Sequence, residues 1–279
     1  MRKQWGRALV IAVASVVIVL GLVFAVTTRS GKHDGTRWLS AEQGPLMMLT
    51  TPQTPYYSTA APAPTTRPTL TVDSGCRVGQ GPATLDPVPA ATTRRVNAAW
   101  DRVERWLKAK APTTAATLRP PATIERIAQA QRQSGVAFPA ELVASLLRHD
   151  GVSGIGDSFA LPPFHHPASA EGMESQAKVM CDVLTSSGVD DSVGSWWHGR
   201  FVPIAVNGGG DGLFLDQRTG TGRLGEWDHE GSVSFDSWPA TLTELLEQTA
   251  TALETGGTII GGYRPVVTGN RALDWDFPR

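Results

Sequence analysis

Residues 202–216 read VPIAVNGGGDGLFLD, and this stretch decides the fold. An apolar run enters it, three glycines and an aspartate interrupt it, and a second apolar run leaves. A phosphate-binding loop would need a helix after the glycines, so that the helix N-terminus faces the anion. Here a strand-like run follows, the G-K-[ST] ending is missing, and Asp211 would repel phosphate. The stretch therefore predicts a hairpin turn, with Gly208, Gly209 and Gly210 at positive φ and Asp211 bonding turn amides.

The segments around this hairpin predict an α+β domain. Short runs rich in Val, Phe and Leu predict antiparallel strands over residues 200–206, 212–215, 222–227 and 232–235, with a weaker candidate at 159–161. Apolar residues at helical spacing predict helices over residues 97–110, 123–135, 139–151, 169–184 and 241–254. Thr123 and Ser169 are suited to cap helix N-termini, and Gly135, Gly151 and Gly256 to end helices. The order predicts a mostly antiparallel sheet flanked by helices, rather than alternating βαβ units.

The N-terminus predicts a membrane anchor. Residues 1–7 are basic, and residues 8–26, ALVIAVASVVIVLGLVFAV, carry no charge. Nineteen residues in a helix span roughly 28 Å, about the thickness of the hydrocarbon core. A cleaved signal peptide is the alternative, but its apolar core would be shorter. The basic residues before the segment predict a single-pass protein of the cell membrane whose C-terminal domain lies outside the cytoplasm, although Arg29, Lys32 and Arg37 weaken the contrast.

The next segment, residues 27–95, is rich in proline, threonine and alanine and contains nine prolines. This composition predicts a disordered linker that holds the following domain away from the membrane. The folded domain is expected over residues 96–256. Residues 257–279 are expected to form a loosely ordered tail, in which Ile259, Ile260 and Trp275 could still dock on the domain.

The chain contains two cysteines, Cys76 and Cys181. Outside the cell they could form a disulfide, and the alternative is a free thiol at each position. Their spacing does not fit a zinc site. Residues 96–279 carry 15 basic and 22 acidic side chains, a net charge of −7. This charge disfavours nucleic acid and favours a basic protein partner.

Two candidate sites follow from the residue types. A hydrolase or metal-binding enzyme could use Asp211 and Asp216 with a histidine, but His165 and His166 are adjacent and point opposite ways on extended chain. His149 is better explained as a helix C-terminal cap. A protein partner could instead contact Trp196, Trp197 and Arg200, since Trp and Arg are favoured interface anchors. The alternative is that one tryptophan is core and the other covers a loop. No cofactor is predicted.

Several motifs in order resemble one family. They are WDRVERWL at 100–107, FPAEL at 138–142, SLLRHDG at 145–151, FVPIAVNGGGDGLFLD at 201–216, a G-x-V strand at 231–233 and Trp238-Pro239 before the last helix. Together they resemble the SUKH superfamily, the Smi/Knr-type domains, over residues 96–256.

The resemblance implies an α+β, non-enzymatic binding domain. Bacterial members look like immunity proteins that neutralise secreted toxins, and fungal relatives regulate cell-wall assembly. It also implies that Gly209, Gly210, Asp211 and Asp216 form a structural turn and strand rather than a catalytic site. Immunity proteins of this kind are expected in the cytoplasm, so the predicted anchor and linker are a departure. We therefore expect a membrane-anchored protein-binding module whose partner is a basic toxin or a cell-envelope protein.

Overall fold

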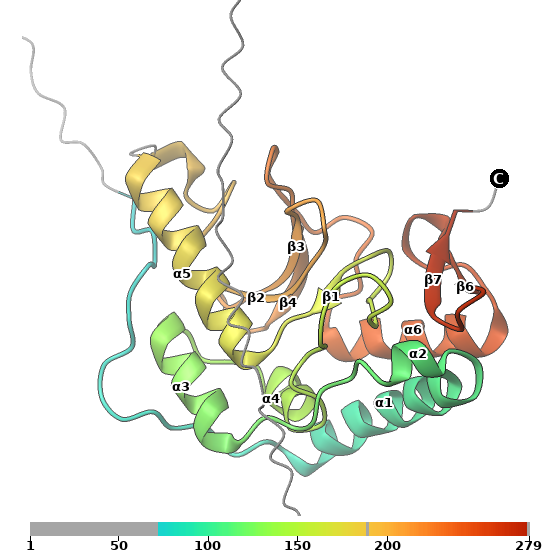
Figure 1. Cartoon of the computed structure of the whole chain (residues 1–279). Coiled ribbons are helices and arrows are strands. Elements are labelled where there is room, and N and C mark those ends of the chain that lie inside the picture. Colours follow the sequence, from blue (N-terminus) through green and yellow to red (C-terminus); the bar gives the residue numbers. More distant parts are fainter. Residues whose placement is uncertain (1–71, 188–189, 278–279) are drawn as a thin grey trace, which may run out of the picture. The chain divides into compact units, whose positions relative to one another are not determined.

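The computed structural model describes residues 72–187 and 190–277 (Figure 1). The predicted basic segment 1–7, the predicted membrane helix 8–26 and the predicted linker up to residue 71 lie outside these described residues. Within the described ranges, no helix is both long enough and apolar enough to cross a membrane.

A five-stranded antiparallel sheet lies at the centre of the domain, with its strands in sequence order. The strands are β1 (His166–Pro167), β2 (Phe201–Val206), β3 (Gly212–Asp216), β4 (Arg223–Trp227) and β5 (Val233–Ser234). The hairpin predicted from residues 202–216 is confirmed, because β2 pairs with β3 from Phe201 opposite Asp216 to Val206 opposite Gly212.

The alternation of side chains along these strands creates two cores, one on each face of the sheet. The main core contains Val202, Leu213, Leu215 and Leu224 together with apolar residues of the helices. The second core is smaller and aromatic, and consists of Met180, Leu184, Trp197, Phe201, Phe214 and Trp227. The sheet is therefore buried on both sides, although its ends remain open to solvent.

Helices cover the sheet as their apolar stripes require (Figure 1). They are α1 (Ala90–Lys110), α2 (Pro112–Ala115), α3 (Ile124–Ser134), α4 (Ala140–Leu146), α5 (Ala170–Ser187) and α6 (Leu242–Thr255), with short 3₁₀ turns η1 (Asp190–Ser192) and η2 (Ile260–Gly262). Helices α1, α3, α4 and α6 contribute to the main core, whereas α5 contributes to both cores.

Several helix ends follow from local chemistry. The Thr123 side chain accepts a hydrogen bond from Arg126 N, and Gly135 ends α3 in the left-handed conformation. Gly256 ends α6 in the same conformation. Ser169 Oγ accepts a hydrogen bond from Gly172 N at 3.1 Å, as expected of an N-cap. These predicted ends are confirmed.

The predicted end of the linker at residue 95 is wrong. Helix α1 begins at Ala90, and residues 72–89 lie on the domain. Leu85 and Val88 pack against the main core, which anchors this proline-containing stretch. Composition alone therefore overestimated the linker, because a few apolar residues are enough to dock an extended segment.

Two other predicted elements are corrected. Helix α4 ends at Leu146, so Gly151 is not its C-cap. The chain leaves the helix before Gly151, because Asp150 N donates a hydrogen bond to Pro120 O instead of to a carbonyl of α4. Residues 159–161 do not join the sheet, since only Leu161 forms an isolated bridge, to His165. The edge strand is instead β1.

The predicted loose tail contains a second, two-stranded sheet. Strand β6 (Arg264–Val267) pairs with β7 (Leu273–Asp276). Leu273 and Trp275 are buried in the main core, and Trp275 Nε1 donates to Ala160 O at 3.0 Å. The tail is therefore part of the domain through Asp276, and Trp275 docks on the domain as the sequence had left open.

Candidate functional site

The glycine stretch forms the turn between β2 and β3. Asn207 Oδ1 accepts hydrogen bonds from Gly209 N at 2.8 Å and from Asp211 N at 2.9 Å. Of the three glycines only Gly210 has a positive φ, 104°. The side chain that bonds the turn amides is therefore Asn207, and the prediction that Asp211 does so is wrong.

Asp211 instead ties this turn to the loop between β4 and β5. Its Oδ1 accepts from His229 N at 3.2 Å and lies 2.7 Å from His229 Nδ1, and its Oδ2 accepts from Asn207 Nδ2 at 2.9 Å. The hydrogen bond from His229, helped by the one from Asn207, holds the pKa of Asp211 below its ordinary value. The same hydrogen bond raises the pKa of His229. The two loops therefore share one charge-assisted contact.

Asp216 lies at the other end of β3. Five residues of strand at about 3.3 Å each separate it from Asp211 by roughly 17 Å. Its carboxylate accepts from Arg218 Nη2 at 2.8 Å and from Arg218 N at 2.9 Å. The structure therefore does not bring Asp211 and Asp216 together, and they cannot share one metal ion or one substrate atom.

One group among the described residues has the composition of a cation site. Ligand atoms of Asp211, Asp228 and His229 lie within 4.8 Å of one another, on exposed loops. Asp228 Oδ1 already accepts from Glu230 N at 2.8 Å and Gly231 N at 3.1 Å. Hydrogen bonds of the two loops thus account for this arrangement.

His165 is a buried residue whose surroundings the sequence did not indicate. It is 2% exposed, and burial lowers its pKa to about 4. Its Nε2 lies 3.6 Å from Glu226 Oε1, too far for a hydrogen bond. Trp238 packs edge-on against its ring. The neutral imidazole of His165 is therefore a buried side chain that packs against Trp238.

The two candidate tryptophans have different surroundings. Trp197 is 2% exposed and packs against Phe201, Phe214 and Trp227 in the second core. It cannot contact a partner, so that prediction is wrong for Trp197. Trp196 is half-buried, packs edge-on against Trp227 and donates from Nε1 to His229 O at 3.4 Å. The alternative interpretation, in which one tryptophan is core and the other covers a loop, therefore describes Trp197 and Trp196 respectively.

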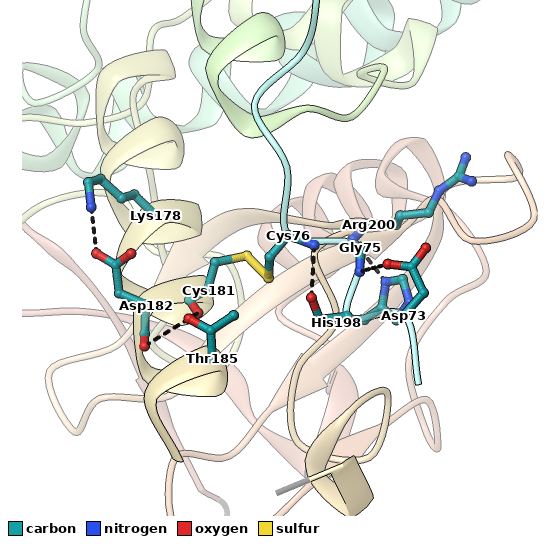
Figure 2. The surroundings of a disulfide bond; sticks show 10 residues. Asp73, Gly75, Cys76, Lys178, Cys181, Asp182, Thr185, His198 and Arg200 are labelled. Carbon is teal, nitrogen blue, oxygen red and sulfur yellow. Dashed lines mark hydrogen bonds and ion pairs between the residues drawn. A yellow bond between two sulfur atoms is a disulfide. The ribbon is translucent and has the colours of Figure 1, made fainter. Parts of the chain in front are cut away.

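Arg200 is exposed at the start of β2. Its side chain forms no ion pair with any residue in the described ranges. It lies beside Gly75, in the segment that carries Cys76 (Figure 2). Arg200 and Trp196 therefore have different neighbours, and both stay predictions as partner contacts.

The sequence left the pairing of the cysteines open, and the structure joins them. Cys76 and Cys181 form a disulfide that links residues 105 apart and attaches the N-terminal segment to α5 (Figure 2). A groove of about 310 Å³ lies beside the bond, lined by both cysteines and by Val78, Ala177 and Thr185. The only signal in the sequence was the pair of cysteines itself.

A second long-range contact joins two of the sequence motifs. Glu104 of the 100–107 motif accepts from Arg148 Nε at 2.7 Å and lies 3.0 Å from His149 Nε2, both in the 145–151 motif. His149 Nδ1 faces Arg119 O at 2.9 Å. His149 therefore bridges α1 and the loop before α3, and its predicted role as a helix cap is wrong.

Comparison with known proteins gives one family. Residues 121–247 match the SMI1 / KNR4 family (SUKH-1). The matched region runs from just before α3 into α6 and includes the whole five-stranded sheet. No curated protein matches the chain significantly.

Proposed function

The chain carries a domain of the SUKH superfamily, and from this premise we propose a membrane-tethered, non-enzymatic module that binds a protein partner outside the cytoplasm. The family match supports a module of the immunity or regulator type. The tether, the compartment and the partner are the further steps of the proposal.

The observation that carries the compartment is the Cys76–Cys181 disulfide. Disulfides persist in oxidising compartments and are rare in the cytosol. The chain has no other cysteines, so every thiol it has is used in this bond. The uncharged residues 8–26 and the basic residues before them support the same arrangement, with the domain outside.

The surface that best suits a partner lies where β3 begins and β4 ends. Trp196 is half-buried there, beside the loops that Asp211 and His229 join. Asp228 and Glu230 are exposed at the same end, and neither has an Arg or Lys partner in the described residues. Glu230 Oε1 lies 3.7 Å from His229 Nε2, but an aromatic anchor beside two exposed carboxylates that lack an Arg or Lys partner suits a basic partner surface.

The separation of Asp211 from Asp216 argues against the alternative of a hydrolase that uses both. Asp216 is occupied by Arg218, and Asp211 by His229 and Asn207. Each carboxylate has a structural role at its own end of β3. The binding module is therefore the better account of these residues.

A thiol-trapping experiment tests the compartment. Cells that express the full chain are quenched with acid, denatured and treated with a polyethylene glycol maleimide. We expect no mass shift without prior reduction and a shift by two reagents after reduction. A shift by two reagents in unreduced samples would place the domain in a reducing compartment. The Cys76→Ser/Cys181→Ser variant, which has no thiols, is the matched control.

Affinity capture with the full chain in detergent tests partner binding. A partner that depends on the proposed surface is captured by the wild type and lost with Trp196→Ala. Trp106→Ala is the matched control, because Trp106 is also partly buried but lies on α1. Equal capture by the wild type, Trp196→Ala and Trp106→Ala would show that the partner binds at a different surface.

A further inference from the structure

Residues 72–79, which we call the strap, cross the outside of the domain between α5 and the loop before β2 (Figure 2). The strap has no helix or strand of its own. Figure 2 shows Cys76 bonded to Cys181 of α5 on one side, with His198 and Arg200 on the other side. The strap is thus the first described part of the chain, and it lies inside residues 27–95, the segment predicted to be a linker.

Few noncovalent bonds hold the strap. Gly199 N donates to Ser74 O at 2.7 Å, and Gly79 N donates to Arg132 O at 2.7 Å. The ion pair between Arg77 and Asp73, 2.6 Å long, is internal to the strap and exposed. Two backbone hydrogen bonds contribute little net stability, because the same groups bond water when the strap is released. The disulfide is therefore the main attachment of this segment.

The strap nevertheless fits its seat closely. A Cβ atom on Gly199 would lie 2.2 Å from Gly75 C, and one on Gly135 would lie 1.7 Å from Arg77 O. Only glycine lets the two backbones approach this far. The seat is therefore shaped for the strap, so that a released strap has a defined position to which it can return.

The attachment changes immediately after the strap. Leu85 and Val88 pack against the main core, so residues 82–89 stay docked without the disulfide. Between these regions Gly81 has a φ of 83° and no atom near its missing Cβ. A glycine in open space is a suitable hinge, because it can change φ and ψ without a clash.

The other end of the disulfide also stays in place without the bond. Ala170 and Met173 of α5 are in the main core, and Met180 is in the second core. Around Cys181, Lys178 pairs with Asp182 at 2.5 Å, and Thr185 Oγ1 donates to Cys181 O (Figure 2). Helix α5 therefore does not depend on the strap for its position.

Both sulfur-bearing residues are accessible. Cys76 and Cys181 are only half-buried, and they line the groove of about 310 Å³ between the strap, the end of α3 and α5. Thiol–disulfide exchange needs a thiolate to reach one of the sulfurs. The groove provides room for a small thiol or for the side chain of a dithiol protein.

From these observations we infer that Cys76–Cys181 is a redox-sensitive clamp: a dithiol reductant cleaves it, and the strap swings away about Gly81 while the domain stays folded. One thiolate of the dithiol attacks a sulfur, the S–S bond breaks, and the released thiolate takes up a proton. The second thiol of the dithiol then displaces the other cysteine and becomes part of a new disulfide. Two electrons pass from the dithiol to the clamp, which ends as two thiols.

Release changes the surface at the start of β2. It removes Gly75 from His198 and from the side chain of Arg200, one of the predicted partner contacts. It also frees the eight residues of the strap, which lengthens the connection between the domain and the predicted membrane helix at residues 8–26. Any effect of this release on partner binding rests on the proposed function. Release of the strap itself can be measured on the purified protein.

Hydrogen exchange and proteolysis of the full chain in detergent test the clamp, with and without dithiothreitol. The Gly199 amide has Ser74 O as its partner, so we expect its exchange to accelerate at least about tenfold on reduction. Trypsin cleavage between Arg77 and Val78 should accelerate by a similar factor. The Leu224 amide, which donates to Ala240 O, and the α1 cleavage sites at Arg105 and Lys108 should not change.

The Cys76→Ser variant, which removes the bond and leaves Cys181 in α5, should behave as the reduced wild type with or without dithiothreitol. Two outcomes would overturn the clamp. If Gly199 and the Arg77 site keep their oxidised rates after reduction, the strap does not open. If Leu224 and the α1 sites accelerate as well, the bond holds the whole fold. Because this experiment uses purified protein, it is independent of thiol trapping in cells and of partner capture.

Discussion

Asp211 Oδ1 lies 2.7 Å from His229 Nδ1, although 18 residues separate the two along the chain. This contact joins the β2–β3 turn to the β4–β5 loop, and Trp196 Nε1 donates to the backbone oxygen of the same His229. The glycine turn and the candidate tryptophan therefore belong to one loop surface at the open end of the sheet.

The Asp211–His229 contact predicts a defined pH window for the order of these loops. The pKa of His229 is raised, so its contribution is complete below the ordinary histidine value of 6.5 and is lost as pH rises through the raised pKa. The pKa of Asp211 is lowered, so its contribution is present above 3.8 and is lost as pH falls through the lowered pKa. Nuclear magnetic resonance titration of the His229 ring should report a raised pKa.

Asp211→Asn is the matched variant for that titration, since it keeps the shape of the side chain and removes the charge. We expect the pKa of His229 to return toward its ordinary value. A His229 titration that is the same in Asp211→Asn and the wild type would show that the contact is not formed in solution.

The turn glycines should respond unequally to alanine. Gly210 has a φ of 104°, and its Cβ would lie 3.4 Å from the His229 ring, whereas Gly208 has no positive φ and no neighbour within 4 Å. Gly210→Ala should therefore lower the free energy of unfolding by about 1–3 kcal/mol. Gly208→Ala should change it by less than about 1 kcal/mol. Urea denaturation would measure both, and equal losses would contradict the turn geometry.

The two adjacent tryptophans should separate stability from binding. Trp197 is 2% exposed in the second core, so Trp197→Ala should cost about 3–5 kcal/mol of unfolding free energy. Trp196 is half-buried, so Trp196→Ala should cost less than about 2 kcal/mol. Thermal and urea unfolding would rank the variants. A larger loss for Trp196→Ala would mean that the two side chains had been assigned to the wrong environments.

Glu104 should contribute strongly to stability at neutral pH. Burial opposes its charge, but hydrogen bonds from His149, Lys108 and Arg148 outweigh burial and lower its pKa. Glu104→Gln removes the buried partner of Arg148, which keeps its exposed ion pair with Asp101, and we expect a loss of about 1–2 kcal/mol. Urea denaturation at pH 7 would measure it.

The same residue predicts an acid dependence. Because the folded pKa of Glu104 is lowered, its contribution is present above the ordinary value of 4.5 and is lost as pH falls through the folded value. The difference between wild type and Glu104→Gln should therefore shrink on acidification. A difference that stays constant from pH 7 to about pH 3 would show that the charge of Glu104 is not what stabilises the contact.

Features that depend on neighbouring residues could be read from the sequence. The β2–β3 hairpin was predicted because two apolar runs flank Asn207 and three glycines, and turn chemistry acts over a few residues. The ends of α3 at Thr123 and Gly135 were predicted for the same reason. The family motifs, too, were contiguous runs of sequence, and residues 121–247 match the family they resemble.

Features that depend on contacts between distant residues could not be read from the sequence. Trp196 and Trp197 are chemically identical neighbours, and only the packing of the second core decides which one is buried. Residues 257–279 were expected to form a loosely ordered tail, whereas β6 and β7 pair there and Trp275 docks on the main core. The membrane helix at residues 8–26 stays a prediction.

The sequence by itself determined an α+β domain with a central hairpin, since hydrophobic period and turn residues act locally. Only the tertiary structure decided that Cys76 meets Cys181, that Glu104 meets Arg148 and His149, and that Asp211 meets His229 rather than Asp216. Each of these contacts forms when packing brings together residues that no local pattern connects. That is why the glycine stretch revealed the fold, while the strap beside α5 became visible only in three dimensions.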